Sequence, residues 1–137
     1  MSKNTIPKTI WIFWMQGFEN APFVVKICLE SWQKYNSNWK VVKLDQENVH
    51  EYISDFELYR PDRSVAAMSD VLRINLLNKF GGVWVDATLF CTKPLDSWLE
   101  IYSRKNGFLA TDNTIHLLND TRKVGTLRIG SYFLVSS

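Results

Sequence analysis

Two short stretches of this sequence carry charged side chains that could take part in catalysis or ligand binding. Asp70 and Arg73 are three residues apart, so they share one face if their segment is a helix. Asp86 follows Gly81-Gly82-Val83-Trp84-Val85, where the glycine pair is typical of a helix end and the apolar residues of a buried strand. A strand-end carboxylate suits a metal ion or a sugar hydroxyl, and an arginine suits a phosphate or a second carboxylate. We therefore predict that the three charged groups converge at the rim of a sheet.

A simpler interpretation of the same residues stays open. Asp70 and Arg73 could form an ordinary exposed ion pair that contributes only a few tenths of a kcal/mol. Asp86 could be a strand-end carboxylate that is bonded to a loop. However, Asp86 interrupts an otherwise apolar run over residues 83–90, and burying a carboxylate without partners is costly. We therefore expect Asp86 to have a ligand or a network of polar contacts.

The segments around these residues alternate between strand-like and helix-like patterns. Short apolar runs, several of them rich in β-branched and aromatic residues, predict strands at 9–14, 39–44, 83–90, 107–111 and 132–135.

Helical features occupy the segments between these strands. Asn20 can cap the first helix, with Pro22 in its first turn, and Ser64 can cap the helix that ends at the glycine pair. Residues 49–56 and 94–102 predict shorter helices. The buried faces of the two longer helices are expected to carry Val24, Ile27, Cys28, Trp32 and Tyr35 in the first and Val65, Met68, Leu72 and Leu76 in the second.

This order of elements predicts an α/β fold. We expect a mostly parallel sheet flanked by helices, in a single domain over residues 1–137. Segments 14–17 and 86–88 would then both follow the carboxyl ends of strands. Because ligands of such sheets bind outside the carboxyl ends, near a switch in strand order, we expect the two segments to border one ligand.

Composition narrows the class of protein. The chain has 137 residues, of which 46% are hydrophobic and 22% charged, as in ordinary globular domains. Its net charge of +2 is too small to suggest nucleic acid as a partner. Cys28 and Cys91 lack a metal-ligand spacing and are expected to be core residues in a reducing compartment. The apolar run 10–15 is too short to span a bilayer, so we expect cytoplasmic residence, which allows a position at the inner face of the membrane.

Three stretches together resemble a known family. They are Ile6-Pro7-Lys8-Thr9-Ile10-Trp11-Ile12-Phe13-Trp14-Met15-Gln16-Gly17, Ser69-Asp70-Val71-Leu72-Arg73 and Gly81-Gly82-Val83-Trp84-Val85-Asp86-Ala87-Thr88. The pattern resembles glycosyltransferases with an Asp-x-Asp sugar-binding region, in particular the capsular polysaccharide synthesis branch. The resemblance implies a GT-A-like, Rossmann-like fold that moves a sugar from a nucleotide diphosphate to a hydroxyl. It covers residues 6–100, with a fainter match at 129–136, and such proteins usually continue further, so the chain is expected to be C-terminally truncated.

The resemblance also implies roles for particular residues. Asp86 and Arg73 would be catalytic, and Asp86 would bind a divalent cation, Mn²⁺ or Mg²⁺. The donor-binding residues would be Trp14, Gln16, Gly17, Asp70, Arg73, Gly82, Asp86 and Thr88. Thr88 is a departure, because the commoner motif has a second aspartate there and a hydroxyl is a weaker ligand for a hard cation. Metal dependence is therefore open.

The implied donor is a nucleotide diphosphate sugar, with a UDP-sugar favoured, and the implied acceptor is a glycan or a lipid-linked glycan. Peripheral membrane association is compatible with the resemblance, and nucleic acid is not an expected partner. Two other functions stay open: a catalytically silent nucleotide-sugar-binding module, suggested by Thr88, and a carbohydrate-binding or assembly subunit, suggested by the six tryptophans. Asp112 and His116 are the only downstream candidates for a base, and His116 fits a structural role better. His50 is expected to be solvated.

Overall fold

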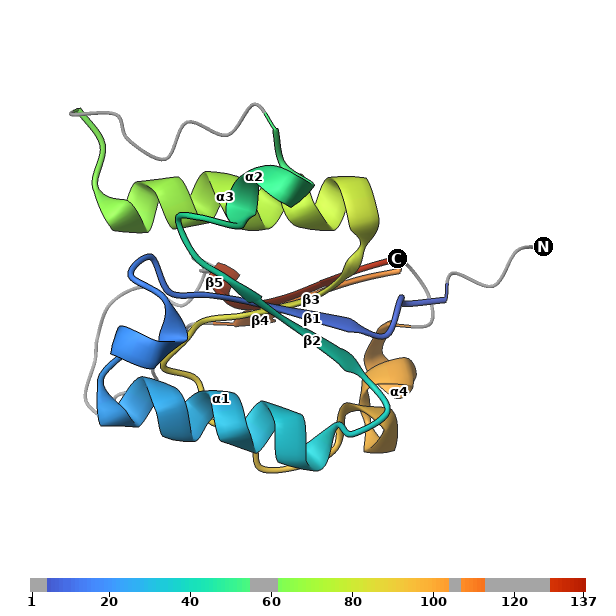
Figure 1. Ribbon diagram of the computed structural model, residues 1–137. Helices are drawn as coiled ribbons and strands as arrows, with labels where there is room; N and C mark the ends of the chain where they lie inside the picture. The colour runs from blue at the N-terminus through green and yellow to red at the C-terminus, as the bar shows by residue number, and fades with distance from the viewer. Residues whose placement is uncertain (1–4, 55–61, 104–106, 113–128) are drawn as a thin grey trace, which may run out of the picture.

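The computed structural model describes residues 5–54, 62–103, 107–112 and 129–137. Its centre is a five-stranded sheet in the order β2-β1-β3-β5-β4, with helices on both faces (Figure 1). The strands are β1 Thr9–Phe13, β2 Lys40–Leu44, β3 Gly82–Val85, β4 Phe108–Asp112 and β5 Ile129–Ser136. All of these strands belong to one sheet, as an α/β domain requires.

The helices lie in two layers around the sheet. The α-helices are α1 Phe23–Tyr35, α2 Val49–Tyr52, α3 Val65–Phe80 and α4 Leu99–Ser103, and the 3₁₀-helices are η1 Phe18–Asn20 and η2 Leu95–Ser97. Figure 1 shows α1 and α4 on one side of the sheet and α2 and α3 on the other. Because α1 joins β1 to β2 and α3 joins β2 to β3, strand order switches between β1 and β3, where ligands of such sheets bind.

The prediction of a mostly parallel sheet is only half right. β1 pairs in parallel with β2 and with β3, whereas β5 runs antiparallel to both β3 and β4. After β3, η2 and α4 precede β4, and β4 runs in the same direction as β3 because both are antiparallel to β5. The exception is β5, which follows β4 in the chain and lies antiparallel between β3 and β4. The sheet is therefore mixed.

The third strand is also shorter than predicted, because it ends at Val85 rather than continuing to residue 90. Asp86 still donates its backbone N–H to the carbonyl of Tyr132 over 2.9 Å, but the chain then turns, and the N–H of Leu89 bonds to the carbonyl of Asp86. Aspartate commonly opens such a turn. The residue that seemed to interrupt a strand thus ends it.

The start of the first helix differs from the prediction. Asn20 is not its cap, because α1 begins at Phe23 after Pro22, and the Asn20 amide donates to the carbonyl of Gln16 instead. Proline disfavours helical geometry in the residue before it, and Ala21, which precedes Pro22, is extended. The buried face also differs from the prediction: it carries Val25, Cys28, Leu29, Ser31 and Trp32, while Val24 and Tyr35 are exposed.

The helix that carries Asp70 and Arg73 begins and ends as predicted. The Ser64 hydroxyl accepts a hydrogen bond from the Ala67 N–H over 3.2 Å. Gly81 ends the helix with a φ of +67°. Gly82 has a φ of +100°, and a Cβ there would lie 2.6 Å from the Thr9 carbonyl oxygen, so only glycine fits this close approach.

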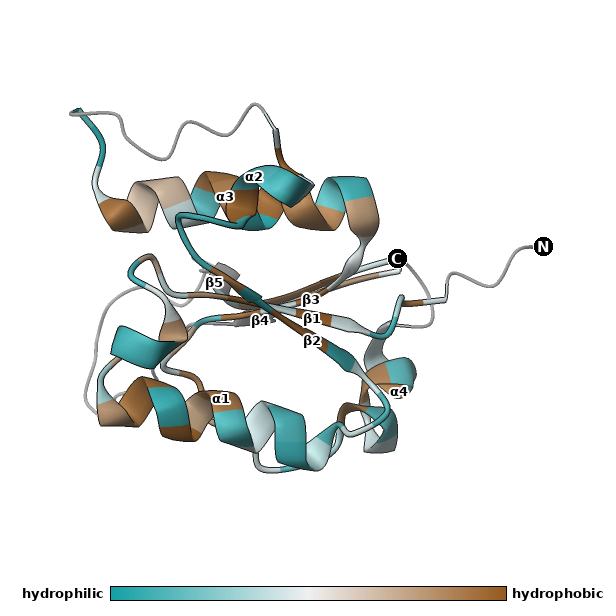
Figure 2. Cartoon of the chain, viewed as in Figure 1, coloured by the Kyte–Doolittle hydropathy of each residue, from teal (hydrophilic) through white to brown (hydrophobic). Residues whose placement is uncertain are grey.

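Two hydrophobic cores fill the spaces on the two faces of the sheet, and Figure 2 shows apolar residues along the central strands. Trp11 is buried in the α3-side core. Cys28 and Cys91 are buried free thiols, and burial raises the pKa of each, which keeps them protonated and unreactive. None of the described helices is long and apolar enough to cross a membrane.

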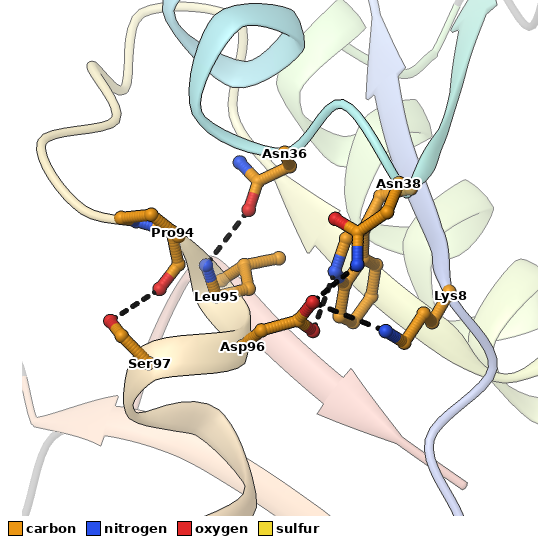
Figure 3. A network of polar contacts seen from close by, with 8 residues as sticks. Lys8, Asn36, Asn38, Pro94, Leu95, Asp96 and Ser97 are labelled. Atoms are coloured by element: carbon orange, nitrogen blue, oxygen red, sulfur yellow. Dashed lines mark hydrogen bonds and ion pairs between the residues drawn. The ribbon is translucent and has the colours of Figure 1, made fainter.

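A polar network closes the edge at which the parallel strands begin (Figure 3). The Asp96 carboxylate accepts hydrogen bonds from the Trp39 indole over 2.9 Å, from Lys8 over 3.1 Å and from the Asn38 amide. Nearby, the Leu95 N–H donates to the Asn36 side chain over 2.8 Å. These contacts join η2 to the segments that precede β1 and β2.

Candidate functional site

Asp86 lies at the carboxyl edge of the sheet, directly after β3. Its Oδ1 accepts a hydrogen bond from the Trp84 indole N–H over 2.9 Å. Residues two apart on a strand point to the same face, which explains why Trp84 and Asp86 meet. The side chain of Asp86 is 36% exposed, so it lies at the surface of the domain rather than in its core.

Arg73 joins the helix to this strand end. One guanidinium nitrogen lies 3.2 Å from Asp70 Oδ1, and the other lies 3.5 Å from Asp86 Oδ1. Its Nε donates to the Ser69 carbonyl, and the guanidinium lies over the Trp84 ring at 5.1 Å from the ring centroid. The side chain is only 7% exposed. A buried arginine held in this way has one fixed orientation.

The charge of this cluster favours a cation. Two carboxylates, Asp70 and Asp86, share one guanidinium, which leaves the group with excess negative charge. In the described part of the chain, Asp86 Oδ2 has no hydrogen-bond partner, so one oxygen is available to a ligand. No group of three or more acidic, histidine or cysteine side chains that could hold a metal occurs among the described residues. A cation at Asp86 would therefore need most of its ligands from water and from a bound phosphate.

The loop after β1 lies along the same edge, beside a hollow of about 400 Å³. Gln16 and Gly17 line this hollow, and residues from the end of β2 complete it. Hydrogen bonds from Trp14 N–H to Leu44 and from Gln46 N–H to Met15 hold the two loops together. Gly17 has a φ of +82°, which favours glycine at that position.

The structure thus brings together some of the predicted site residues and separates others. Asp70, Arg73 and Asp86 form one cluster, and Thr88 is exposed in the turn that follows. Trp14 packs against the core on the α1 side of the sheet. Gly82 starts β3, so it lies at the other end of the strand from Asp86.

Asp112, His116 and His50 were also considered from the sequence. Asp112 ends β4, and His116 lies outside the described residues. His50 is exposed, as predicted.

Two residues of this edge were not singled out from the sequence. Trp84 contacts both Asp86 and Arg73, and the two-residue spacing from Asp86 on one strand could have indicated it. Asp45 lines the hollow, and its carboxylate accepts hydrogen bonds from the backbone N–H groups of Glu47 and Asn48. Such a turn formed by aspartate is typical directly after a strand.

Comparison with known proteins identifies the family. A family model described as capsular polysaccharide synthesis protein matches residues 1–136. The chain belongs to this family.

Curated relatives of the chain are named glycosyltransferases. An uncharacterised glycosyltransferase of Acanthamoeba polyphaga mimivirus is 27% identical over 115 residues, which are 75% of this chain and 46% of the relative. The O-glycosyltransferase braB of Annulohypoxylon truncatum is 29% identical over 67% of this chain and 25% of its own length. The glycosyltransferase afumC of Aspergillus fumigatus is 28% identical over 66% of this chain and 27% of its own length.

The chain therefore spans less than half the length of these relatives. No solved structure matches it. At the level of the family, the comparisons support a glycosyltransferase.

Proposed function

We propose that the chain acts in the transfer of a sugar from a nucleoside diphosphate sugar to a glycan hydroxyl, in capsular or other surface polysaccharide synthesis. The observation that carries the proposal is the cluster at the carboxyl edge of the sheet. There, the buried Arg73 fixes Asp86 with one carboxylate oxygen engaged and the other available. The edge also contains the switch in strand order between β1 and β3. In this proposal the domain is GT-A-like.

The donor would lie along this edge. The hollow beside Gln16 and Gly17 has the size and polar lining to take a nucleoside, with a UDP-sugar as the favoured donor. Since β1 is the neighbour of β3, the diphosphate would extend from the hollow toward Asp86. Thr88, exposed in the adjacent turn, would offer a hydroxyl to the same ligand.

The chemistry at the diphosphate requires positive charge, because the leaving group gains negative charge as the sugar departs. Asp86 Oδ2 would bind Mn²⁺ or Mg²⁺ together with the donor's own phosphate oxygens, and the ion would supply that charge when it is bound. Arg73 is too buried to be a free anion site, so its role in the proposal is to orient Asp86 and to add positive potential. Asp70 holds the other side of the same guanidinium.

A second candidate is a module that binds the donor without transferring its sugar. One observation supports it: among the described residues, Asp86 belongs to no group of three or more acidic, histidine or cysteine side chains that could hold a cation firmly. A donor-hydrolysis assay separates the two candidates. Release of free sugar and nucleoside diphosphate supports transferase chemistry, and binding without release supports the silent module.

Calorimetric titration with UDP, in Mn²⁺ and in chelator, tests the donor site. Asp86→Asn keeps an acceptor for the Trp84 indole but removes the charge, so it should abolish the gain in affinity that Mn²⁺ gives the parent. Glu30→Gln, at an exposed carboxylate on α1, is the matched control and should retain the gain. A parent without metal-dependent UDP affinity, or an Asp86→Asn variant equal to the parent, would contradict the proposal.

A further inference from the structure

An apolar groove of about 480 Å³ lies on the α1 and α4 side of the sheet. Its wall is mainly aromatic, and the aromatic lining residues are Trp32, Phe90, Trp98, Tyr102, Tyr132 and Phe133. Tyr102 is 67% exposed and Phe90 is 51% exposed, so aromatic surface is open to solvent there. Monomeric proteins rarely leave an open cluster of aromatic rings without a ligand or partner.

This groove is connected to the donor edge through the backbone. Residues Leu89 to Lys93, which form one wall, directly follow the turn that contains Asp86 and Thr88. Tyr132, on another wall, accepts the hydrogen bond from the Asp86 N–H. The Asp86 carboxylate, by contrast, contacts Trp84 and Arg73 on the α3 side. The groove is therefore a neighbour of the donor site and not part of it.

Polar groups in the groove show which kind of ligand fits. Lys93 is the only charged residue among the described lining residues, and it has no ion-pair partner in the described part of the chain. The Trp98 indole N–H also lacks a hydrogen-bond acceptor among the described residues, although its ring packs at 5.6 Å from the Phe133 ring. The site thus offers donors and positive charge beside aromatic faces, which complements a ligand with acceptors, negative charge and apolar ring faces.

We propose that this groove binds an anionic glycan, whose sugar rings stack on Trp98 and Tyr102 while an acidic group contacts Lys93. A pyranose ring has one face of C–H groups that packs on an aromatic ring, and its hydroxyls and carboxylate accept hydrogen bonds. In the context of the proposed function, on which this inference rests, the groove would hold the acceptor glycan at a distance from the reacting hydroxyl. A ligand of lipid chains would leave Lys93 unpaired, and a nucleic acid would need more positive charge.

The probe is a trimer of galacturonic acid, with maltotriose as the neutral control, observed by ¹H–¹⁵N NMR on the full chain. The trimer should shift the Trp98 indole signal, assigned from its loss in Trp98→Phe. Tyr102→Ala removes an exposed ring without opening the core and should weaken binding about fivefold. Phe108→Ala, at an exposed ring outside the groove, is its matched control and should bind like the parent.

The charge is tested separately. Lys93→Gln should lower affinity for the trimer about threefold to fivefold, toward that of maltotriose, and Lys40→Gln, an exposed lysine on β2, should leave it unchanged. Added salt should weaken binding to the parent and not to Lys93→Gln. Binding of UDP should be unaffected by Tyr102→Ala, and binding of the trimer should be unaffected by Asp86→Asn, so a failure of one site is distinguished from a failure of the other.

Three results would overturn the proposal. The first is no shift of the Trp98 signal at millimolar trimer. The second is equal affinity for the trimer and maltotriose, with no effect of Lys93→Gln. The third is a concentration-dependent dimer, seen by sedimentation, that Tyr102→Ala dissociates, because the groove would then be an interface between two copies of the chain.

Discussion

Opposite edges of the sheet each carry a cluster of one tryptophan, one aspartate and one basic residue, and the two clusters differ in how many of their polar groups are bonded and buried. At the carboxyl edge, the Trp84 group consists of Trp84, Asp86 and Arg73, and at the amino edge, the Trp39 group consists of Trp39, Asp96 and Lys8. In each, an indole N–H donates to a carboxylate over 2.9 Å and a cation lies beside the same carboxylate. The shared parts make the differences informative.

The first difference is how fully the carboxylate is used. Both oxygens of Asp96 accept hydrogen bonds, Oδ1 from Trp39 and Oδ2 from Lys8 and Asn38. Asp86 uses Oδ1 only, within the described part of the chain. A satisfied carboxylate gains little from a further ligand, whereas a half-engaged one can bind a cation without losing its indole bond. The contrast explains why we place a ligand at one edge and a structural contact at the other.

The second difference is burial of the cation. Lys8 is 54% exposed, while Arg73 is buried under the helix and over the Trp84 ring. Water screens the exposed pair, so its contribution to stability is small. The buried guanidinium cannot be solvated if its partners are removed, so the Trp84 group depends on all of its members.

The largest expected effect is on the free energy of unfolding, and it differs between Arg73 and Lys8. Arg73→Met should lower the free energy of unfolding by about 2 kcal/mol, because it removes charge-assisted bonds at a buried position. The same change at the other edge, Lys8→Met, should cost about 0.5 kcal/mol or less. Urea unfolding of both variants and the parent measures this. Equal losses would show that burial does not distinguish the two groups.

An intermediate effect concerns the indoles. Trp84→Phe should lower Mn²⁺-dependent UDP affinity about tenfold, because it removes the hydrogen bond that orients the proposed metal ligand. Trp39→Phe removes the corresponding bond to Asp96 and should leave that affinity unchanged. Calorimetry of the two variants under identical conditions provides the comparison. A similar loss in both would mean that the indoles act only through general stability.

The smallest effect is a pH dependence at the amino edge. The Asn38 hydrogen bond, with those from Trp39 and Lys8, holds the pKa of Asp96 below its ordinary value despite partial desolvation. Since the folded-state pKa is lowered, this contribution to stability is present above the unfolded-state pKa of about 3.9 and is lost as pH falls through the lower folded value.

The parent should therefore lose slightly more stability than Asp96→Asn between about pH 4 and about pH 2. Thermal unfolding across this range measures the difference. If stability falls equally with pH in the parent and in Asp96→Asn, Asp96 does not contribute to the pH dependence of stability in acid.

The clusters also show what the sequence could predict. The meeting of Asp70, Arg73 and Asp86 was predictable, because helix spacing, a glycine stop and a strand end are local patterns. The cap at Ser64 and the turn at Gly81 were predictable for the same reason. The Trp39 group was not, because Lys8 and Asp96 are 88 residues apart and meet only through the sheet.

Other features depended on tertiary pairing. β5 follows β4 in the chain and lies antiparallel between β3 and β4, and no residue in β5 marks its direction. The early end of β3 depended on Asp86 finding Trp84 and Arg73, which fix the side chain where the chain turns. The buried face of α1 was set by packing against the sheet, where Val25, Leu29 and Trp32 join one core cluster.

The most direct test of the central claim uses the two indoles as reporters. Mn²⁺ is paramagnetic and broadens the NMR signals of nearby protons. With UDP present, added Mn²⁺ should broaden the indole N–H signal of Trp84, which bonds to Asp86, and leave that of Trp39 at the opposite edge sharp. Asp86→Asn should abolish the broadening. Equal broadening of both signals, or sharp signals from both while UDP binds with Mn²⁺, would contradict a donor site at Asp86.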